Sequence, residues 1–182
     1  FGRSILELGG NNAMVVMPSA DLELAARAIT FAAVGTAGQR CTTLRRLIVH
    51  GDVAAPLLAR LEKIYASVRV GDPLEDGVLV GPLVDRASFE QMQSALTQAR
   101  EQGGSVQGGE RECAALGEDA WYARPALVRM PAQSAVVQHE TFAPILYVLT
   151  CTSLDEAIAL QNGVPQGLSS AIFTTDLREA ER

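Results

Sequence analysis

Short β-branched and apolar runs alternate with amphipathic segments along most of this chain. The runs at 13–17 (AMVVM), 46–50 (RLIVH), 145–150 (ILYVLT) and 168–174 (LSSAIFT) are typical of buried strands. Parallel strands need a crossover connection that is usually a helix. This order therefore predicts an α/β fold, in three layers, with a mostly parallel sheet flanked by helices.

The segments between these strands carry helix and turn signals. Helices are predicted at about 21–34, 53–67, 87–102 and 153–161, further strands at 4–8 and 122–130, a short strand and turn at 105–109, and a helix that opens at Asp176 and is cut off by the end of the chain. Ser153 and Glu156 form a capping box, in which each side chain satisfies a backbone amide of the other. Residues 70–85 hold three Gly and two Pro and are predicted as a long loop.

The composition is that of one globular domain with a sizeable core. Hydrophobic residues make up 48% of 182 residues, and charged residues 20%. A net charge of −6 argues against nucleic acid or an anionic membrane as the main partner. No apolar run approaches the roughly 20 residues needed to cross a bilayer. Fourteen of the fifteen basic residues are Arg, which we interpret as codon bias in a GC-rich bacterial genome.

The three cysteines are widely spaced and form no metal-binding pattern with histidine. They are Cys41, Cys113 and Cys151. We therefore expect no metal site and a reducing, cytoplasmic location.

Cys41 differs from an ordinary structural cysteine because its neighbours are polar and positively charged. The stretch TAGQRCTTLRR (36–46) places three arginines close to it in sequence. Nearby positive charge favours the thiolate, which is the reactive form. Cys41 is therefore a candidate nucleophile, and a quiet cysteine at a helix end is the alternative hypothesis. Cys113 and Cys151 lack this setting, and we expect them to be structural.

A cysteine nucleophile needs a base, and the candidates are His50, His139 and Glu7. His50 closes an apolar strand, where a capping or surface role is more typical. Glu7 interrupts SILELGG on the face opposite its leucines, ahead of a Gly–Gly turn. A desolvated carboxylate at the end of a strand suits general-base work, and a solvated glutamate on an edge strand is the alternative.

Three segments resemble the signature segments of the NAD(P)-dependent aldehyde dehydrogenase superfamily. They are LELGGNN with Glu7, GQRCTT with Cys41 and HETFAP with Glu140, and the spacing of 34 residues between Glu7 and Cys41 also matches. VGDP, GPLVD and QGLSSAIFT follow in the expected order, so the resemblance covers essentially the whole chain. The amino-acid sequence of these segments most resembles the antiquitin branch, which oxidises α-aminoadipate semialdehyde in lysine breakdown.

The resemblance implies a covalent mechanism on an aldehyde substrate. Cys41 is expected to attack the aldehyde carbon and form a thiohemiacetal, with its own backbone N–H as part of the oxyanion hole. Loss of hydride then gives a thioester, and Glu7 activates the water that hydrolyses it to the acid.

The resemblance also assigns binding roles. Glu140 is expected to hold the nicotinamide-ribose hydroxyls and Phe142 to pack on that ribose, while Leu8 and Gly9 border the nicotinamide. Arg40 is a candidate for holding a substrate carboxylate, and a purely structural charge is the alternative.

Some parts that the superfamily uses are absent from this sequence. No two glycines are two residues apart, which excludes a G-x-G-x-x-G motif. By resemblance the cofactor-binding domain precedes ELGG, and a C-terminal oligomerisation tail follows this chain. FGRSILELGG also begins without Met in strand-like sequence. We therefore expect residues 1–182 to be the catalytic domain of a longer homo-oligomeric enzyme, with NAD or NADP bound mainly elsewhere and negligible dehydrogenase turnover in isolation.

Two further hypotheses stay open. One is a stand-alone thiol hydrolase in which Cys41 works with His50 or His139. The other is a non-catalytic interaction module. A CoA-using acylating dehydrogenase is disfavoured, because such enzymes generally lack the glutamate that Glu7 resembles.

Overall fold

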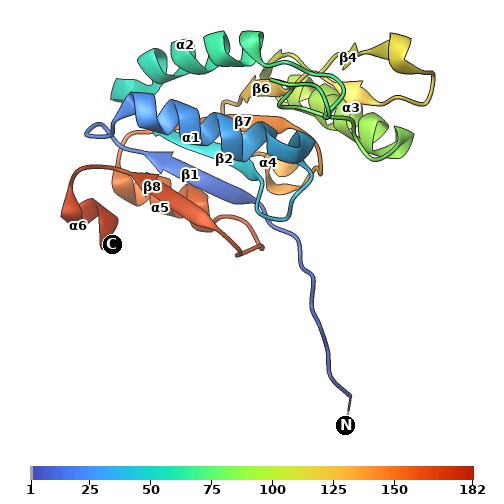
Figure 1. Ribbon diagram of the computed structural model, residues 1–182. Coiled ribbons are helices and arrows are strands. Elements are labelled where there is room, and N and C mark those ends of the chain that lie inside the picture. Colours follow the sequence, from blue (N-terminus) through green and yellow to red (C-terminus); the bar gives the residue numbers. More distant parts are fainter. Residues whose placement is uncertain (1) are drawn as a thin grey trace.

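A computed structural model describes residues 2–182 of the chain. Six strands form one sheet in the order β3-β6-β7-β2-β1-β8, in which β3 runs antiparallel to β6 and the other neighbours are parallel (Figure 1). These strands are β1 (Asn12–Val16), β2 (Leu44–His50), β3 (Ser105–Gln107), β6 (Ala126–Arg129), β7 (Ile145–Cys151) and β8 (Ser170–Phe173). The strands β4 (Arg111–Glu112) and β5 (Tyr122–Ala123) form a separate antiparallel pair.

Helices cover both faces of the sheet. Helices α1 and α2 lie over one face, and α5 lies over the other (Figure 1). The helices are α1 (Leu22–Val34), α2 (Gly51–Ser67), α3 (Arg86–Glu101), α4 (Ala135–Gln138), α5 (Leu154–Asn162) and α6 (Leu177–Ala180), with short 3₁₀ turns η1 (Gly35–Gly38) and η2 (Ala114–Leu116). The predicted α/β class with a mostly parallel sheet is confirmed. None of the helices within residues 2–182 is both long enough and apolar enough to cross a membrane.

The helix starts follow the capping signals in the sequence. Asp21 accepts hydrogen bonds from the backbone N–H groups of residues 23 and 24 at the start of α1. At the start of α5, Ser153 Oγ accepts from the N–H of Glu156 at 3.2 Å. In the predicted capping box, Glu156 would accept from the N–H of Ser153. Its Oε2 instead accepts from the N–H of Thr152, at 2.8 Å. The Glu156 carboxylate thus pairs with the backbone N–H of the residue before the N-cap.

The strand predicted at 4–8 is wrong. Residues 2–11 form neither helix nor strand, and the start of the chain extends away from the domain (Figure 1). Ile5, Leu6 and Leu8 are 89%, 75% and 69% exposed. Alternating apolar residues form a strand only where a neighbouring strand supplies backbone partners. β1, the next strand, already pairs with β2 and β8 on its two sides.

The run at 122–130 divides into two strands, because Pro125 lies between them and has no N–H for a ladder. β5 pairs with β4, while β6 joins the main sheet. The one-turn helix α4 was not predicted, since four residues carry no readable helical period.

The core lies between the sheet and its helices and centres on β2. Leu47, Ile48 and Val49 of this strand are fully buried. Two arginines at its start, Arg45 and Arg46, are buried to the same degree, at 2% and 0% exposure. Buried charge must be compensated by hydrogen bonds, so this end of β2 is built differently from the apolar remainder.

Candidate active site

The predicted site residues gather at the amino ends of the parallel strands. Cys41 lies three residues before β2, the Gly9–Gly10 pair precedes β1, and Glu140 precedes β7. Ligands in open α/β sheets usually bind at the carboxyl ends. Glu7 was predicted to lie at such an end, the end of a strand at 4–8. This expectation is wrong, because residues 4–8 form no strand.

Cys41 and Glu7 line the same open depression, whose volume is about 500 Å³. Apart from Glu140, every predicted site residue contributes to its wall. The lining residues are Glu7, Leu8, Gly9, Gln39, Arg40, Cys41, Thr42 and Phe142. Residues far apart in sequence therefore meet around one cavity.

The Cys41 loop (residues 36–43) starts with an abrupt reversal at the end of α1. Thr36, Ala37 and Gly38 have φ of 57°, 51° and 71°, in the left-handed region that side chains disfavour. A Cβ at Gly38 would collide with the backbone of Ala143, so only glycine fits there. The strain marks a loop whose course is imposed by its surroundings.

The same loop is closed by reciprocal hydrogen bonds around Cys41. The N–H of Arg40 donates to Thr43 Oγ1, and the N–H of Thr43 donates to the Arg40 carbonyl, both at 3.1 Å. Within residues 2–182 the backbone N–H of Cys41 makes no hydrogen bond. This donor is therefore not used by the fold of residues 2–182.

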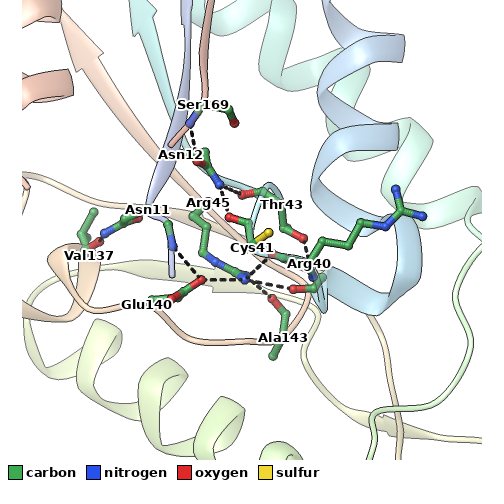
Figure 2. Close-up of polar contacts among 12 residues, drawn as sticks. Asn11, Asn12, Arg40, Cys41, Thr43, Arg45, Val137, Glu140, Ala143 and Ser169 are labelled. Atoms are coloured by element: carbon green, nitrogen blue, oxygen red, sulfur yellow. Dashed lines mark hydrogen bonds and ion pairs between the residues drawn. The ribbon is translucent and has the colours of Figure 1, made fainter. Parts of the chain in front are cut away.

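Asn12 fastens the Cys41 loop to the sheet (Figure 2). Its Nδ2 donates to the carbonyls of Cys41 and Thr43, each at 2.8 Å, and its Oδ1 accepts from the N–H of Ser169 at 3.0 Å. The side chain is 4% exposed. Sequence reasoning missed this role; the available signal was an amide that opens a buried strand directly after Gly–Gly.

The glycine pair fits between the nucleophile loop and Glu140. A Cβ on Gly10 would lie 2.5 Å from the Cys41 carbonyl oxygen, and one on Gly9 would collide with Oε2 of Glu140. The close approach to the Cys41 backbone therefore requires glycine at position 10, whereas a side chain at position 9 would displace the carboxylate of Glu140. This contact also anchors the inner end of the segment that carries Glu7.

Glu140 is held from the protein side by a buried cation. Its Oε1 accepts from the N–H of Gly10 at 3.2 Å and lies 3.6 Å from Nη2 of Arg45 (Figure 2). Burial lowers the pKa of Arg45, and the neighbouring Glu140 acts in the opposite direction. The ring of Phe142 lies 5.2 Å from the same guanidinium and is 43% exposed.

The arginines near Cys41 in sequence are directed to other partners. Arg45 faces Glu140 and backbone carbonyls, and the guanidinium of Arg40 points away from the sulfur (Figure 2). Arg46, on the opposite face of β2, donates to the carbonyls of Asn11 and Leu160 at 2.7–2.9 Å. Its burial lowers its pKa to about 10. The geometry therefore gives no support to direct activation of the thiol by these three charges.

Glu7 is exposed, and no hydrogen bond or ion pair joins it to any other residue of 2–182. The desolvation that was expected for this carboxylate is not present. Its position over the depression depends on the backbone of the segment 2–9.

Neither histidine faces Cys41 in the described part of the chain. His50 lies at the carboxyl end of β2, where it caps α2. Cys41 precedes the amino end of the same strand, and the seven residues of this strand span about 20 Å. His139 lines a separate cavity of about 210 Å³ beside α3 and α4. The thiol hydrolase hypothesis therefore lacks its imidazole.

The other two cysteines have structural surroundings. The thiol of Cys113 donates to the carbonyl of Val70 at 3.5 Å, and Cys151 is 1% exposed at the end of β7. Burial raises the pKa of both thiols, which disfavours the reactive form.

Comparison with known proteins identifies the family. The chain matches the aldehyde dehydrogenase family over residues 1–182 and belongs to it. The family predicted from the signature segments is thus confirmed.

Two relatives show where the chain lies within the family. It is 50% identical over 174 residues to "Aldehyde dehydrogenase family 7 member A1" of Pisum sativum, covering 96% of the chain and 34% of that protein. It is 46% identical over 178 residues to "Alpha-aminoadipic semialdehyde dehydrogenase" of Bos taurus, covering 97% and 32%. The chain spans about a third of the length of these relatives.

Solved structures share the fold. An NAD-dependent aldehyde dehydrogenase from Sinorhizobium meliloti superimposes with a TM-score of 0.91 at 33% identity, over 96% of this chain and 35% of that one. PnpE in complex with nicotinamide adenine dinucleotide gives a TM-score of 0.92 at 34% identity, over 96% and 36%.

Proposed function

We propose that residues 1–182 are the catalytic domain of an NAD- or NADP-dependent enzyme that oxidises an aldehyde to a carboxylic acid. The observation that carries this proposal is that Cys41, Glu7 and Phe142 line one depression, and that Glu140 lies against Gly9 of its wall. A nucleophile and a carboxylate around one cavity are what a thioester route requires.

The chemistry follows from these two side chains. The thiolate of Cys41 attacks the aldehyde carbon, and the free N–H of Cys41 stabilises the oxyanion of the thiohemiacetal. A donor aimed at developing charge contributes roughly 3–4 kcal/mol. Bound NAD or NADP would supply the acceptor for the hydride that leaves this carbon, and the carbon would then form a thioester with Cys41. Glu7 takes a proton from the attacking water, the C–S bond breaks, and the acid and the free thiol result.

The residues present fit the ribose of a nicotinamide cofactor. Oε1 of Glu140 is held from within, while Oε2 faces Gly9, where a side chain would fill the space. A fixed carboxylate oxygen is a suitable acceptor for ribose hydroxyls. Glu140 and Phe142 would hold the ribose, with Leu8 and Gly9 along the nicotinamide, and the rest of the cofactor would bind mainly outside this chain.

The substrate class comes from the relatives and from Arg40. A named relative is an α-aminoadipic semialdehyde dehydrogenase, and that substrate carries its carboxylate at the end opposite the aldehyde. Arg40 lines the depression while its guanidinium points away from the sulfur. It would therefore meet the far end of such a substrate, and this supports an aminoadipate-type aldehyde and a place in lysine breakdown.

The intact enzyme would be a cytoplasmic bacterial homo-oligomer. Membership of the family supports the oligomer, the unpaired cysteines support the location, and the excess of Arg over Lys supports a bacterial source.

The decisive experiment traps the acyl-enzyme in the intact protein. With α-aminoadipate semialdehyde and NAD, rapid quenching and mass spectrometry should find the acyl mass on the peptide containing Cys41. Cys41→Ser should remove the adduct and lower kcat/KM by at least about 10⁴-fold, while Cys113→Ser should change neither. An adduct elsewhere, or undiminished turnover by Cys41→Ser, would refute the proposal.

The isolated 182-residue chain should show negligible NAD reduction with the same aldehyde but slow hydrolysis of an activated ester. Ester hydrolysis needs the thiol and not the nicotinamide. Measurable NAD reduction by this chain would contradict the expectation that cofactor binding lies mainly elsewhere.

A further inference from the structure

Arg45 contacts both halves of the site although it reaches neither the depression nor the solvent. It is 2% exposed and lies on β2, four residues after Cys41. Nη2 donates to the carbonyls of Gly38 at 3.1 Å and Arg40 at 3.3 Å, both in the Cys41 loop. Nη1 donates to the carbonyl of Ala143 at 3.2 Å.

The same guanidinium fixes the carboxylate proposed to bind ribose. Nη2 lies 3.6 Å from Oε1 of Glu140, and Phe142 covers the guanidinium at 5.2 Å. Since Oε1 also accepts from the N–H of Gly10 at 3.2 Å, the carboxylate is held with Oε2 against Gly9. One planar cation thus joins the nucleophile loop to the cofactor-binding residues (Figure 2).

We propose that Arg45 is a positioning residue: it orients Glu140 for the cofactor ribose and ties that carboxylate to the backbone beside Cys41. This inference rests on the proposed function and adds a residue that contacts neither substrate nor cofactor. The planar fork is needed because it reaches a carboxylate and three carbonyls at once, which a single ammonium does not match.

The test is a double-mutant cycle on NAD binding in the intact enzyme, measured by calorimetry with Arg45→Met, Glu140→Gln and the double variant. Losing this buried ion pair with Glu140 should weaken NAD binding about 10- to 100-fold in Arg45→Met. If Arg45 acts through Glu140, the double variant should bind no more weakly than Glu140→Gln alone.

Arg46→Met is the matched control, because Arg46 is equally buried on the same strand but contacts neither Glu140 nor Phe142. It should lower the Tm yet keep the Kd for NAD within about threefold. Should Arg45→Met not fold, Arg45→Lys keeps the charge without the fork and should weaken NAD binding about tenfold.

A second readout follows the nucleophile loop. Without NAD, Arg45→Met should change the rate at which iodoacetamide alkylates Cys41, whereas Glu140→Gln should leave this rate unchanged. Additive effects in the cycle, an unaltered Kd in Arg45→Met or Arg45→Lys, or an unaltered alkylation rate would overturn the inference. If the wild-type enzyme bound no NAD, the proposed function would fall as well.

Discussion

Cys41 and Glu7 share a cavity, but they are attached to the domain in opposite ways. The Cys41 loop is tied to β1 and β8 through Asn12 and to the approach to β7 through Arg45. The segment 2–9 is exposed along its whole length and is fixed only at its inner end, where Gly9 and Gly10 meet Glu140 and the loop.

This difference shows which geometry the domain itself encodes. The position of the sulfur follows from buried hydrogen bonds between residues of this chain. The position of the Glu7 carboxylate is set by the direction of one backbone segment whose apolar side chains Ile5, Leu6 and Leu8 face outward. Exposed apolar side chains clustered in one segment commonly mark a contact surface, and we expect the cofactor domain of the intact enzyme to cover them.

Among variants that keep Cys41, the largest effect should come from Glu7→Gln in the intact enzyme. Loss of the general base should lower steady-state turnover about 10³-fold, because the thioester is no longer hydrolysed. The first turnover should still release one NADH per site, since in the proposed mechanism hydride transfer depends on Cys41 and not on Glu7. Stopped-flow absorbance at 340 nm separates these phases. A lost burst would mean that Glu7 also serves the first step, and the division between the two residues would be wrong.

A smaller loss should follow when the glycine pair is changed. Gly10→Ala forces a Cβ to within 2.5 Å of the Cys41 carbonyl, which displaces the nucleophile backbone. Misplacement on this scale should lower kcat about 100-fold. Gly9→Ala is the matched control: its Cβ meets only the side chain of Glu140, so it should chiefly raise the KM for NAD. Equal effects of both variants on kcat would show that the two contacts are not separate.

The main helices and most strands of the sheet could be predicted from the sequence, because these elements follow local periodicity and capping residues. The capping aspartate of α1 and the continuous apolar run of β7 are examples. The prediction of a strand at 4–8 failed because a strand depends on pairing partners that periodicity does not reveal. The pairing of Arg45 with Glu140 spans 95 residues. Such long-range contacts, like the hydrogen bonds of Asn12, come from tertiary packing and were not readable from spacing.

Asn12→Ala should loosen the Cys41 loop and destabilise the chain. It leaves the carbonyls of Cys41 and Thr43 and the N–H of Ser169 without their partner, and unsatisfied buried groups cost about 1–3 kcal/mol each before relaxation. We expect a net loss of about 2–3 kcal/mol in urea unfolding of the 182-residue chain. Asn12→Asp, which keeps the acceptor for Ser169, should lose the same two donors and retain that one bond. If Asn12→Ala unfolded like the wild type, the loop would not depend on this clamp.

The smallest effect should come from the segment 2–9. Leu6→Ala should change the free energy of unfolding of the 182-residue chain by no more than about 0.5 kcal/mol, because Leu6 is 75% exposed. Leu47→Ala is the matched control: this leucine is fully buried on β2, and its truncation should cost about 2–5 kcal/mol. A loss above about 1 kcal/mol for Leu6→Ala would show that the segment packs on the domain in solution. The contrast with the Cys41 loop would then be weaker, because Glu7 would be held by packing as well as by its glycine anchor.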